Sequence, residues 1–408
     1  MKSTTIVLTI VLLFILLVRL FFSFVDSPIY RVGDRIKITH SFLKDPKKNS
    51  FGQYFFTSNM LISIPLHPRF SYGDILEIEG VVTEIENEKG KLLTVKNPKI
   101  TLVSKNNPFM SSTIFARNRV IDVVTKTLPP KESGLFLGIV LGVRDRLEST
   151  FYEHLRDAGV LHIIAASGQN ISILASILLF SFEKFVKRKY ALLFTALLIF
   201  FYAGLVGFDP PIVRASIMAV VSFGALALGR QNSAIFTLFL TGWGMVIITP
   251  SSLTDISFQL SFLSTFGILT IKSLIERVIT FRFISILKDD LTTTLSAQIA
   301  TFPIMVATFG AYSLLTLPVN LLILWTIPFL MTIGVISLFI SIIMPILAKP
   351  FVIASYPLLA YFVAVVEISE RYKWIVEVES VPIAFICGYY LILIAIVIRF
   401  RQPERRIF

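Results

Sequence analysis

Polar side chains interrupt four apolar runs of this chain, and their types suit a hydrated path better than catalysis. The first run begins with LHIIAASGQNIS (161–172). Polar groups left in hydrocarbon cost several kcal/mol, so residues of this kind are functional candidates. The residues that we expect to line a path are His162, Ser167, Gly168, Gln169, Asn170, Asp209, Arg214, Gln259 and Gln298.

The first segment allows two local structures. If 160–182 forms one uninterrupted helix, His162, Gln169 and Ser176 are spaced seven residues apart and form a polar stripe along one face. The pair 167–168 could instead break the helix and free backbone carbonyls. For His162 with Gln169 we favour a path lining, and for Ser172 and Ser176 we favour hydrogen bonding between helices.

The second segment, GLVGFDPPIVRASIM, joins a helix cap to a cation inside an apolar run. Asp209 is a natural cap, and the prolines after it suit the first helical positions. Arg214 then falls in the second turn of a span. It could pair with Asp209 or offer a fixed cation to a passing anion, and both interpretations remain open.

Two further segments each contain an amide side chain, which is unfavourable in hydrocarbon unless it is hydrogen-bonded. Gln259 lies within ISFQLSFLSTFGIL, and Gln298 lies just ahead of Pro303 in LSAQIATFPIMVATFG. Three serines share one helix face in the first of these: Ser257, Ser261 and Ser264. Because three of the four segments lie beside Pro or Gly breaks, together they indicate a central polar passage.

The composition sets the class of protein in which these residues must work. The chain has 408 residues, is 55% hydrophobic and 16% charged, and has a mean hydropathy of +0.78. Soluble domains are about 45–50% apolar and about 25% charged, so this is a membrane protein. The net charge of +12 is compatible with nucleic acid, but cytoplasmic loops of membrane proteins also gather Lys and Arg.

The ordinary signatures of enzymes and cofactors are missing from the sequence. Cys387 is the single cysteine, which excludes an intrachain disulfide and a thiolate metal cluster. The four histidines lack metal-ligand spacing, and no Walker A, HExxH or GxSxG motif occurs. We therefore expect no catalytic residue, no metal and no cofactor.

The N-terminal quarter of the chain predicts an anchor followed by a β domain. Residues 1–26 read as an uncleaved signal anchor, with an early Lys2 and no small-residue cleavage site. Residues 27–106 alternate apolar and charged side chains between Gly-containing turns, which predicts about five strands, with an OB-like barrel as a fitting fold. With Lys2 inside the cell, this domain would be extracytoplasmic.

The rest of the chain predicts a helical membrane domain. Residues 107–150 should hold an amphipathic helix, which could equally lie at the membrane interface or pack as a surface helix. They also contain GLFLGIVLGV, which is too short to span and suits a re-entrant segment. Residues 151–408 read as a multi-span domain. The 34 residues 314–347 would reach about 51 Å as one helix, so one piece should be re-entrant or broken. The fold class is thus a polytopic α-helical membrane protein with a small extracytoplasmic all-β domain.

The order of the motifs resembles a known family. LFLGIVLGVRDRL, AGVLHIIAASGQNISIL, FYAGLVGFDPPIVRASIMA, ISFQLSFLSTFGIL and AQIATFPIMVATFGAYSLLTLPVNLL are similar to the competence domain of ComEC-type DNA-uptake channels, over about 132–332. The resemblance implies transport of single-stranded DNA across the bacterial cytoplasmic membrane in natural transformation. It also implies a DNA receptor at the outer face and a cytoplasmic ATPase or helicase as partners, with lipid around the helices.

Two departures from the family pattern stand out. The family commonly has a histidine near the position of Asn170, and many members carry a C-terminal metallo-β-lactamase-like domain, whose HxHxDH motif does not occur here. If the chain is a channel of this kind, strand degradation would belong to another protein or be missing.

A single strand could also contact the β domain, where basic groups and aromatics combine. The candidates are Lys47, Lys48, Tyr54 and Arg69. Two competing classes of function are a transporter of another anionic solute and a non-transporting envelope scaffold.

Overall fold

The computed structural model describes residues 30–42, 47–48, 52–57, 60–65, 67–68, 70, 74–87, 90–105, 108–164, 168–229, 233–278, 285–372, 374–378 and 381–400. The expected anchor, 1–26, lies outside these residues. The chain divides into two compact units, Met1–Asn118 and Arg119–Phe408.

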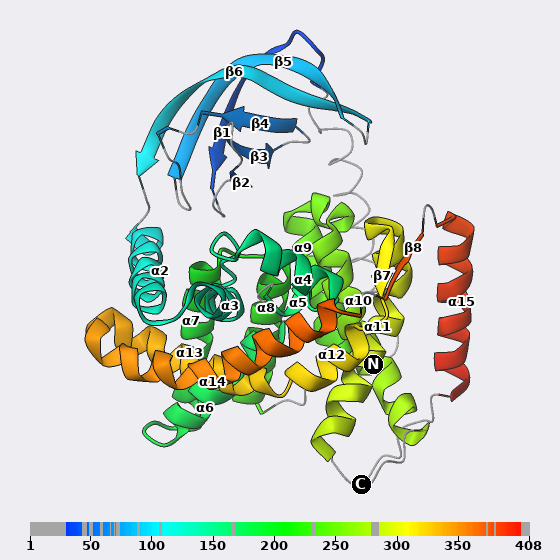
Figure 1. Cartoon of the computed structure of the whole chain (residues 1–408). Coiled ribbons are helices and arrows are strands. Elements are labelled where there is room, and N and C mark those ends of the chain that lie inside the picture. The colour runs from blue at the N-terminus through cyan, green and yellow to red at the C-terminus, as the bar shows by residue number, and fades with distance from the viewer. Residues whose placement is uncertain are drawn as a thin grey trace. The chain divides into compact units, whose positions relative to one another are not determined.

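The first unit is built on one six-stranded sheet with the order β1-β5-β6-β4-β3-β2. Its strands are β1 Arg35–Ser41, β2 Lys47–Lys48, β3 Gln53–Thr57, β4 Met60–Ile64, β5 Asp74–Asn87 and β6 Gly90–Lys105. Neighbouring strands are antiparallel except β4 and β6, which are parallel. Two register shifts in the β5–β6 pair bend these long strands, which curve over the shorter ones (Figure 1). The predicted all-β character is confirmed, with one short strand more than expected.

Alternation along the strands produces the core of this unit. Inward-facing apolar residues of β1, β4 and β5, such as Ile36, Ile62 and Ile78, are buried in one cluster. The buried amide of Gln53 fixes the loop beyond β4, because its Nε2 donates to the carbonyls of Pro65 and Pro68 at 2.9 and 3.0 Å. The sheet is therefore held by both packing and satisfied polar groups.

The second unit is helical. Helix α2, Pro108–Thr127, crosses the boundary between the two units. The remaining helices and the two short strands are, in chain order, α3 Pro130–Leu141, α4 Ser149–Asp157, α5 Leu161–Ile164, α6 Gly168–Glu183, α7 Arg188–Val206, α8 Pro210–Ala227, α9 Ala234–Ile248, the 3₁₀ helix η1 Pro250–Thr254, α10 Ile256–Val278, α11 Ser285–Phe309, β7 Ala311–Ser313, α12 Thr316–Ile323, α13 Thr326–Ile343, α14 Pro345–Glu370, β8 Ile375–Glu377 and α15 Ile383–Phe400.

Six of the described helices are long and apolar enough to cross a bilayer: α7, α8, α10, α13, α14 and α15. The prediction of a polytopic helical membrane protein is confirmed. The shorter apolar α9 adds to this set.

Three apolar segments of this unit are arranged as follows, and the second is divided as its length predicted. In 160–182, α5 is described as far as Ile164 and α6 from Gly168 onward, and 165–167 lie outside the described residues. Residues 314–347 divide into the eight-residue α12 and the longer α13, with Pro318 and Pro328 in their first turns. Residues 352–366 are part of the continuous α14, which tolerates two internal prolines.

The short helix α3 is the most enclosed element of the unit. Every residue from Ser133 to Leu141 is buried. Two glycines permit this packing, because a Cβ at Gly138 would overlap the side chain of Ile164 and a Cβ at Gly334 would overlap that of Val140. A helix of this length cannot span, so its ends must be satisfied inside the protein.

Candidate functional site

Three of the polar segments meet at the first turn of α6. Arg214 of α8 is 5% exposed, and its Nε donates to Oγ of Ser261 in α10 at 2.8 Å. Its Nη1 contacts Sδ of Met218, one turn further along α8, at 3.3 Å. A Cβ placed on Gly168 would lie 2.8 Å from Nη2 of Arg214. The guanidinium thus fills the space that the missing side chain of Gly168 leaves open.

Arg214 does not form an ion pair with Asp209, which was one of the two interpretations of this segment. Arg214 has no ion pair among the described residues. Five residues of helix turn through about 140° beyond a full circle, so the two side chains leave α8 on different faces. Asp209 takes the N-cap position, as expected, but its side chain makes no capping hydrogen bond and has other interactions.

The opposite side of α6 holds the end of α3. Nδ2 of Asn170, which is 1% exposed, donates to the carbonyl of Ile139 at 3.0 Å. The hydroxyl of Tyr202 in α7 donates to the carbonyl of Val140 at 2.7 Å. The last carbonyls of a helix lack partners within the helix, and these two side chains supply them. Asn170 therefore faces α3, away from a path on the Arg214 side.

Sequence reasoning missed Tyr202. Its segment, FYAGLVG, lies next to the motif with Arg214, but a tyrosine in an apolar run gives no sign of a partner 62 residues away. The one available signal was its hydroxyl, which needs an acceptor when buried.

His162 lies in the short helix α5. Its side chain is exposed, and Nδ1 lies 3.2 Å from the carbonyl oxygen of Gly159. Gly159 has a φ of +73° and packs directly on Thr316, so this loop sits against the start of α12. Two motifs that are far apart in sequence are thereby brought together, but His162 is not in the Arg214 cluster.

The other residues of the first segment are distributed differently. Ser167 lies outside the described residues, and Gln169 is exposed on α6. The Ser176 hydroxyl donates to the carbonyl of Ser172 at 2.9 Å, within its own helix. The interpretation of Ser176 as a bond between helices was therefore wrong.

The two amides in the later segments form separate local structures. Nε2 of Gln259 donates to the carbonyl of Leu253 at 2.7 Å and closes the turn between η1 and α10. Oε1 of Gln298 accepts a hydrogen bond of 3.2 Å from the Tyr312 hydroxyl. Neither amide is hydrogen-bonded to Arg214 among the described residues.

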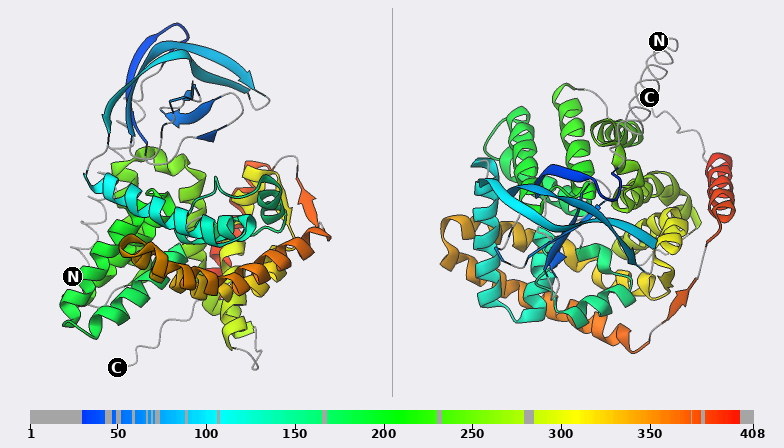
Figure 2. Two further views of the ribbon diagram at one scale, coloured as in Figure 1. Left: turned by 60° about the vertical axis from the view of Figure 1, so that its left-hand side comes forward. Right: turned by 90° about the horizontal axis from the view of Figure 1, so that it is seen from above.

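A proline break next to Gln298 is capped by α15. Pro303 has no N–H, so the carbonyl of Ile299, four residues earlier, loses its helical donor. The Tyr389 hydroxyl donates to this carbonyl at 2.9 Å, and the Tyr390 hydroxyl donates to that of Ala300 at 3.0 Å. α15 buries no residue and stands at the edge of the unit, so these bonds contribute to its attachment (Figure 2).

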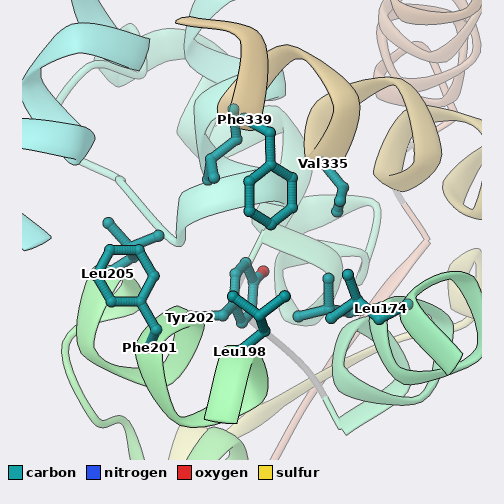
Figure 3. A pocket seen from close by; sticks show the side chains of 9 residues that line it. Leu174, Leu198, Phe201, Tyr202, Leu205, Val335 and Phe339 are labelled. Atoms are coloured by element: carbon teal, nitrogen blue, oxygen red, sulfur yellow. The ribbon is translucent and has the colours of Figure 1, made fainter. Parts of the chain in front are cut away.

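An apolar groove lies between α6, α7 and α13 (Figure 3). Its lining consists of Leu174, Leu178, Leu198, Phe201, Tyr202, Leu205, Val335, Leu338 and Phe339. Because the one hydroxyl here, that of Tyr202, is bonded to Val140, the groove offers nothing to a polar solute. It suits hydrocarbon and is separate from the polar cluster.

In the β unit, the candidate DNA contacts are partly described. Lys47 and Lys48 form the edge strand β2, where Lys47 pairs with Tyr54 of β3. Tyr54 is half-buried, and Arg69 lies outside the described residues. No group of metal-ligating side chains is found in the described part of the chain.

Comparisons with known proteins agree with the motif order. A family model described as Competence protein matches residues 139–403. ComE operon protein 3 of Bacillus subtilis (strain 168) is 27% identical over 221 residues, which cover 54% of this chain and 28% of that protein. The match thus spans little more than a quarter of the relative's length. No solved structure matches the chain.

Proposed function

This chain belongs to the Competence protein family, and from that premise we propose that it is a membrane channel that passes single-stranded DNA across the bacterial cytoplasmic membrane in natural transformation. The observation that carries the proposal is the meeting of α6, α8 and α10 around a buried cation. The two contacts of Arg214, with Ser261 and with Gly168, join segments from three separate motifs.

The chemistry of the substrate supports this function. A DNA strand is a dense anion, and a protein that binds it must supply positive charge. Hydrocarbon cannot accept such a strand, so a path needs hydrogen-bond donors and water. We propose that Gly168, Gln169 and Arg214 line the path directly, with His162 and Ser167 just ahead of them in the chain, and that Asp209, Gln259 and Gln298 lie along its further course.

The structure suggests a supporting role for Asn170. Since its amide is buried against Ile139, we propose that it holds the wall of the path without touching the strand.

The β unit would lie outside the cytoplasm and receive the strand. Lys47, Lys48, Tyr54 and Arg69 combine cations with an aromatic ring, which is the usual chemistry of single-strand binding. A DNA receptor would deliver the strand there. A cytoplasmic ATPase or helicase would pull it, because no nucleotide-binding motif occurs in the chain. We assign the chain no chemical reaction.

The test is entry of labelled DNA into the bacterium that carries this gene. In a strain without the gene, DNA should still bind to cells but should stay fully sensitive to external nuclease, and the wild-type gene should restore protection. Normal protected entry without the gene would refute the proposal. A transporter of another anionic solute or a scaffold would then be the better explanation.

A further inference from the structure

We infer that the two-stranded sheet β7–β8 and the exposed aromatic side chains beside it form an anchor that binds the headgroup layer of the lipid bilayer. The inference concerns a surface that the proposed DNA path does not use. It holds whether the chain passes DNA or another solute.

The chain brings this sheet to the ends of two membrane-crossing helices. β8 follows α14 and precedes α15, both of which are long and apolar enough to span, and β7 lies between α11 and α12. The backbone N–H groups of Leu314 and Val378 extend the pairing, because they donate to the carbonyls of Trp374 and Gly310 at 2.9 and 2.8 Å. Two connections that are far apart in sequence are thereby held together where α14 ends and α15 begins.

The open edges of the sheet exclude it from the hydrocarbon core. β7 and β8 pair only with each other among the described strands, so each keeps one edge without a strand partner. Val376 and Glu377 of β8 are exposed, and both views in Figure 2 show this strand at the margin of the helical unit. Lipid-exposed sheet edges do not occur within hydrocarbon, because their backbone groups would stay unsatisfied. The sheet must therefore lie at a level that water reaches.

The side chains beside the sheet are unsuited to bulk water. Trp374 is 62% exposed and Tyr372 is 60% exposed, and Phe309, Leu314 and Val376 are exposed in the same two connections. Trp and Tyr gather at membrane surfaces, because the apolar part of the ring contacts acyl chains while the N–H or O–H stays among the headgroups. Open sheet edges combined with exposed aromatic rings fit this boundary layer better than either side of it.

The charge of the turn and its place in the chain favour lipid over another protein as the occupant. Arg371, the residue before Tyr372, is exposed, and a guanidinium suits a lipid phosphate. A strand of another protein could pair with an open edge, but strands of three residues offer it few backbone hydrogen bonds. The surface is also continuous with α15, an apolar helix that buries no residue and so faces lipid.

The test measures the depth of Trp374 in the bilayer. The chain has three tryptophans, and Trp243→Phe with Trp325→Phe leaves Trp374 as the single indole. The full-length variant is placed in phosphatidylcholine vesicles whose lipids carry a nitroxide on the headgroup, at carbon 5 or at carbon 12 of the acyl chain. The headgroup or carbon-5 label should quench the fluorescence of Trp374 roughly twofold more strongly than the carbon-12 label.

Leu391 supplies the matched control. It is 69% exposed near the middle of α15. In the same background, Trp374→Phe with Leu391→Trp should reverse the order, so that the carbon-12 label quenches most strongly.

Two results would overturn the anchor. Strongest quenching of Trp374 by the carbon-12 label would place the sheet in hydrocarbon. Weak quenching by all three lipids would assign the surface to bulk water if aqueous iodide quenches strongly, and to a protein partner if it does not.

A spin label gives the same depth if the tryptophan variants do not fold. Trp374→Cys in a Cys387→Ser background carries the label at a single cysteine. Comparable access of oxygen and of a water-soluble nickel chelate to the label would support the anchor, and access of only one of them would overturn it.

Discussion

At the scale of single residues, Gly168 offers the sharpest separation of function from stability. Alanine favours a helix over glycine by about 1 kcal/mol. Its Cβ would lie 2.8 Å from Nη2 of Arg214, which is the end of a flexible side chain and can move. Gly168→Ala should therefore keep or raise the thermal stability of the purified protein while protected DNA entry falls severalfold.

Gly224 provides the matched control for this prediction. It lies inside α8, and a Cβ there would meet nothing within 4 Å. Gly224→Ala should leave DNA entry unchanged. If protected DNA entry were the same for Gly168→Ala and Gly224→Ala, the claim that DNA entry requires the open space at Gly168 would be wrong.

A second prediction at this scale concerns Asn170. Asn170→Ala leaves the buried carbonyl of Ile139 without its donor, which should cost about 1–3 kcal/mol of stability. The measurement is thermal unfolding of the protein in detergent, with the exposed neighbour variant Gln169→Ala as control. An unfolding temperature equal to that of Gln169→Ala would contradict the role of Asn170 at α3.

At the scale of elements, the bond between α11 and α15 can be tested by a double-mutant cycle. Tyr389→Phe should destabilise the protein by about 1 kcal/mol, because the carbonyl of Ile299 loses its donor. Pro303→Ala restores an N–H that can reach this carbonyl within the helix. In the Pro303→Ala background, Tyr389→Phe should therefore be nearly neutral in thermal unfolding. If Tyr389→Phe lowered the thermal stability equally in both backgrounds, the Tyr389 hydroxyl would not be the group that replaces the N–H missing at Pro303.

The strand β1 makes the β unit sensitive to acid. His40 stacks on Phe55 with ring centroids 4.5 Å apart and meets Phe42 edge-on at 5.0 Å. Burial lowers the pKa of His40 below its ordinary 6.5. The unfolded chain therefore binds a proton more readily than the folded one, so stability is full above pH 6.5 and falls as the pH drops toward the lowered pKa.

Limited proteolysis of the β unit in the full chain measures this effect. Cleavage should increase on going from pH 7.5 to below pH 6, after correction for the protease's own pH dependence. His40→Phe keeps an aromatic ring but cannot titrate, so it should show a flatter profile. Identical profiles would rule His40 out as the acid-sensitive group.

Much of the element plan could be predicted from the sequence, but the pairings of its polar groups could not. Hydropathy indicated a polytopic protein, and alternation indicated the β region, because both patterns follow from local burial. The polarity of Asn170 was visible, yet its orientation toward α3 depends on how α6 packs. Tyr389 is 90 residues from its acceptor, and nothing in an apolar helix reveals such a partner.

At the scale of the whole molecule, the proposed orientation makes a simple labelling prediction. Val32 is exposed in the β unit, and Lys187 lies in the loop before α7. In a Cys387→Ser background, Val32→Cys should react with a membrane-impermeant maleimide on intact spheroplasts. Lys187→Cys should react only after permeabilisation. The reverse pattern would place the β unit inside the cell.

The path itself is the central claim, and one cross-linking measurement tests it most directly. A photoreactive amino acid replaces Gln169, which is exposed beside the Arg214 cluster, or Leu197, which is exposed on the apolar α7. Labelled DNA with a bulky protein bound to its trailing end is stalled during entry, and the cells are irradiated. We predict a covalent DNA adduct at 169 and none at 197. Entry of DNA without an adduct at 169, or with equal adducts at both positions, would contradict a path along α6.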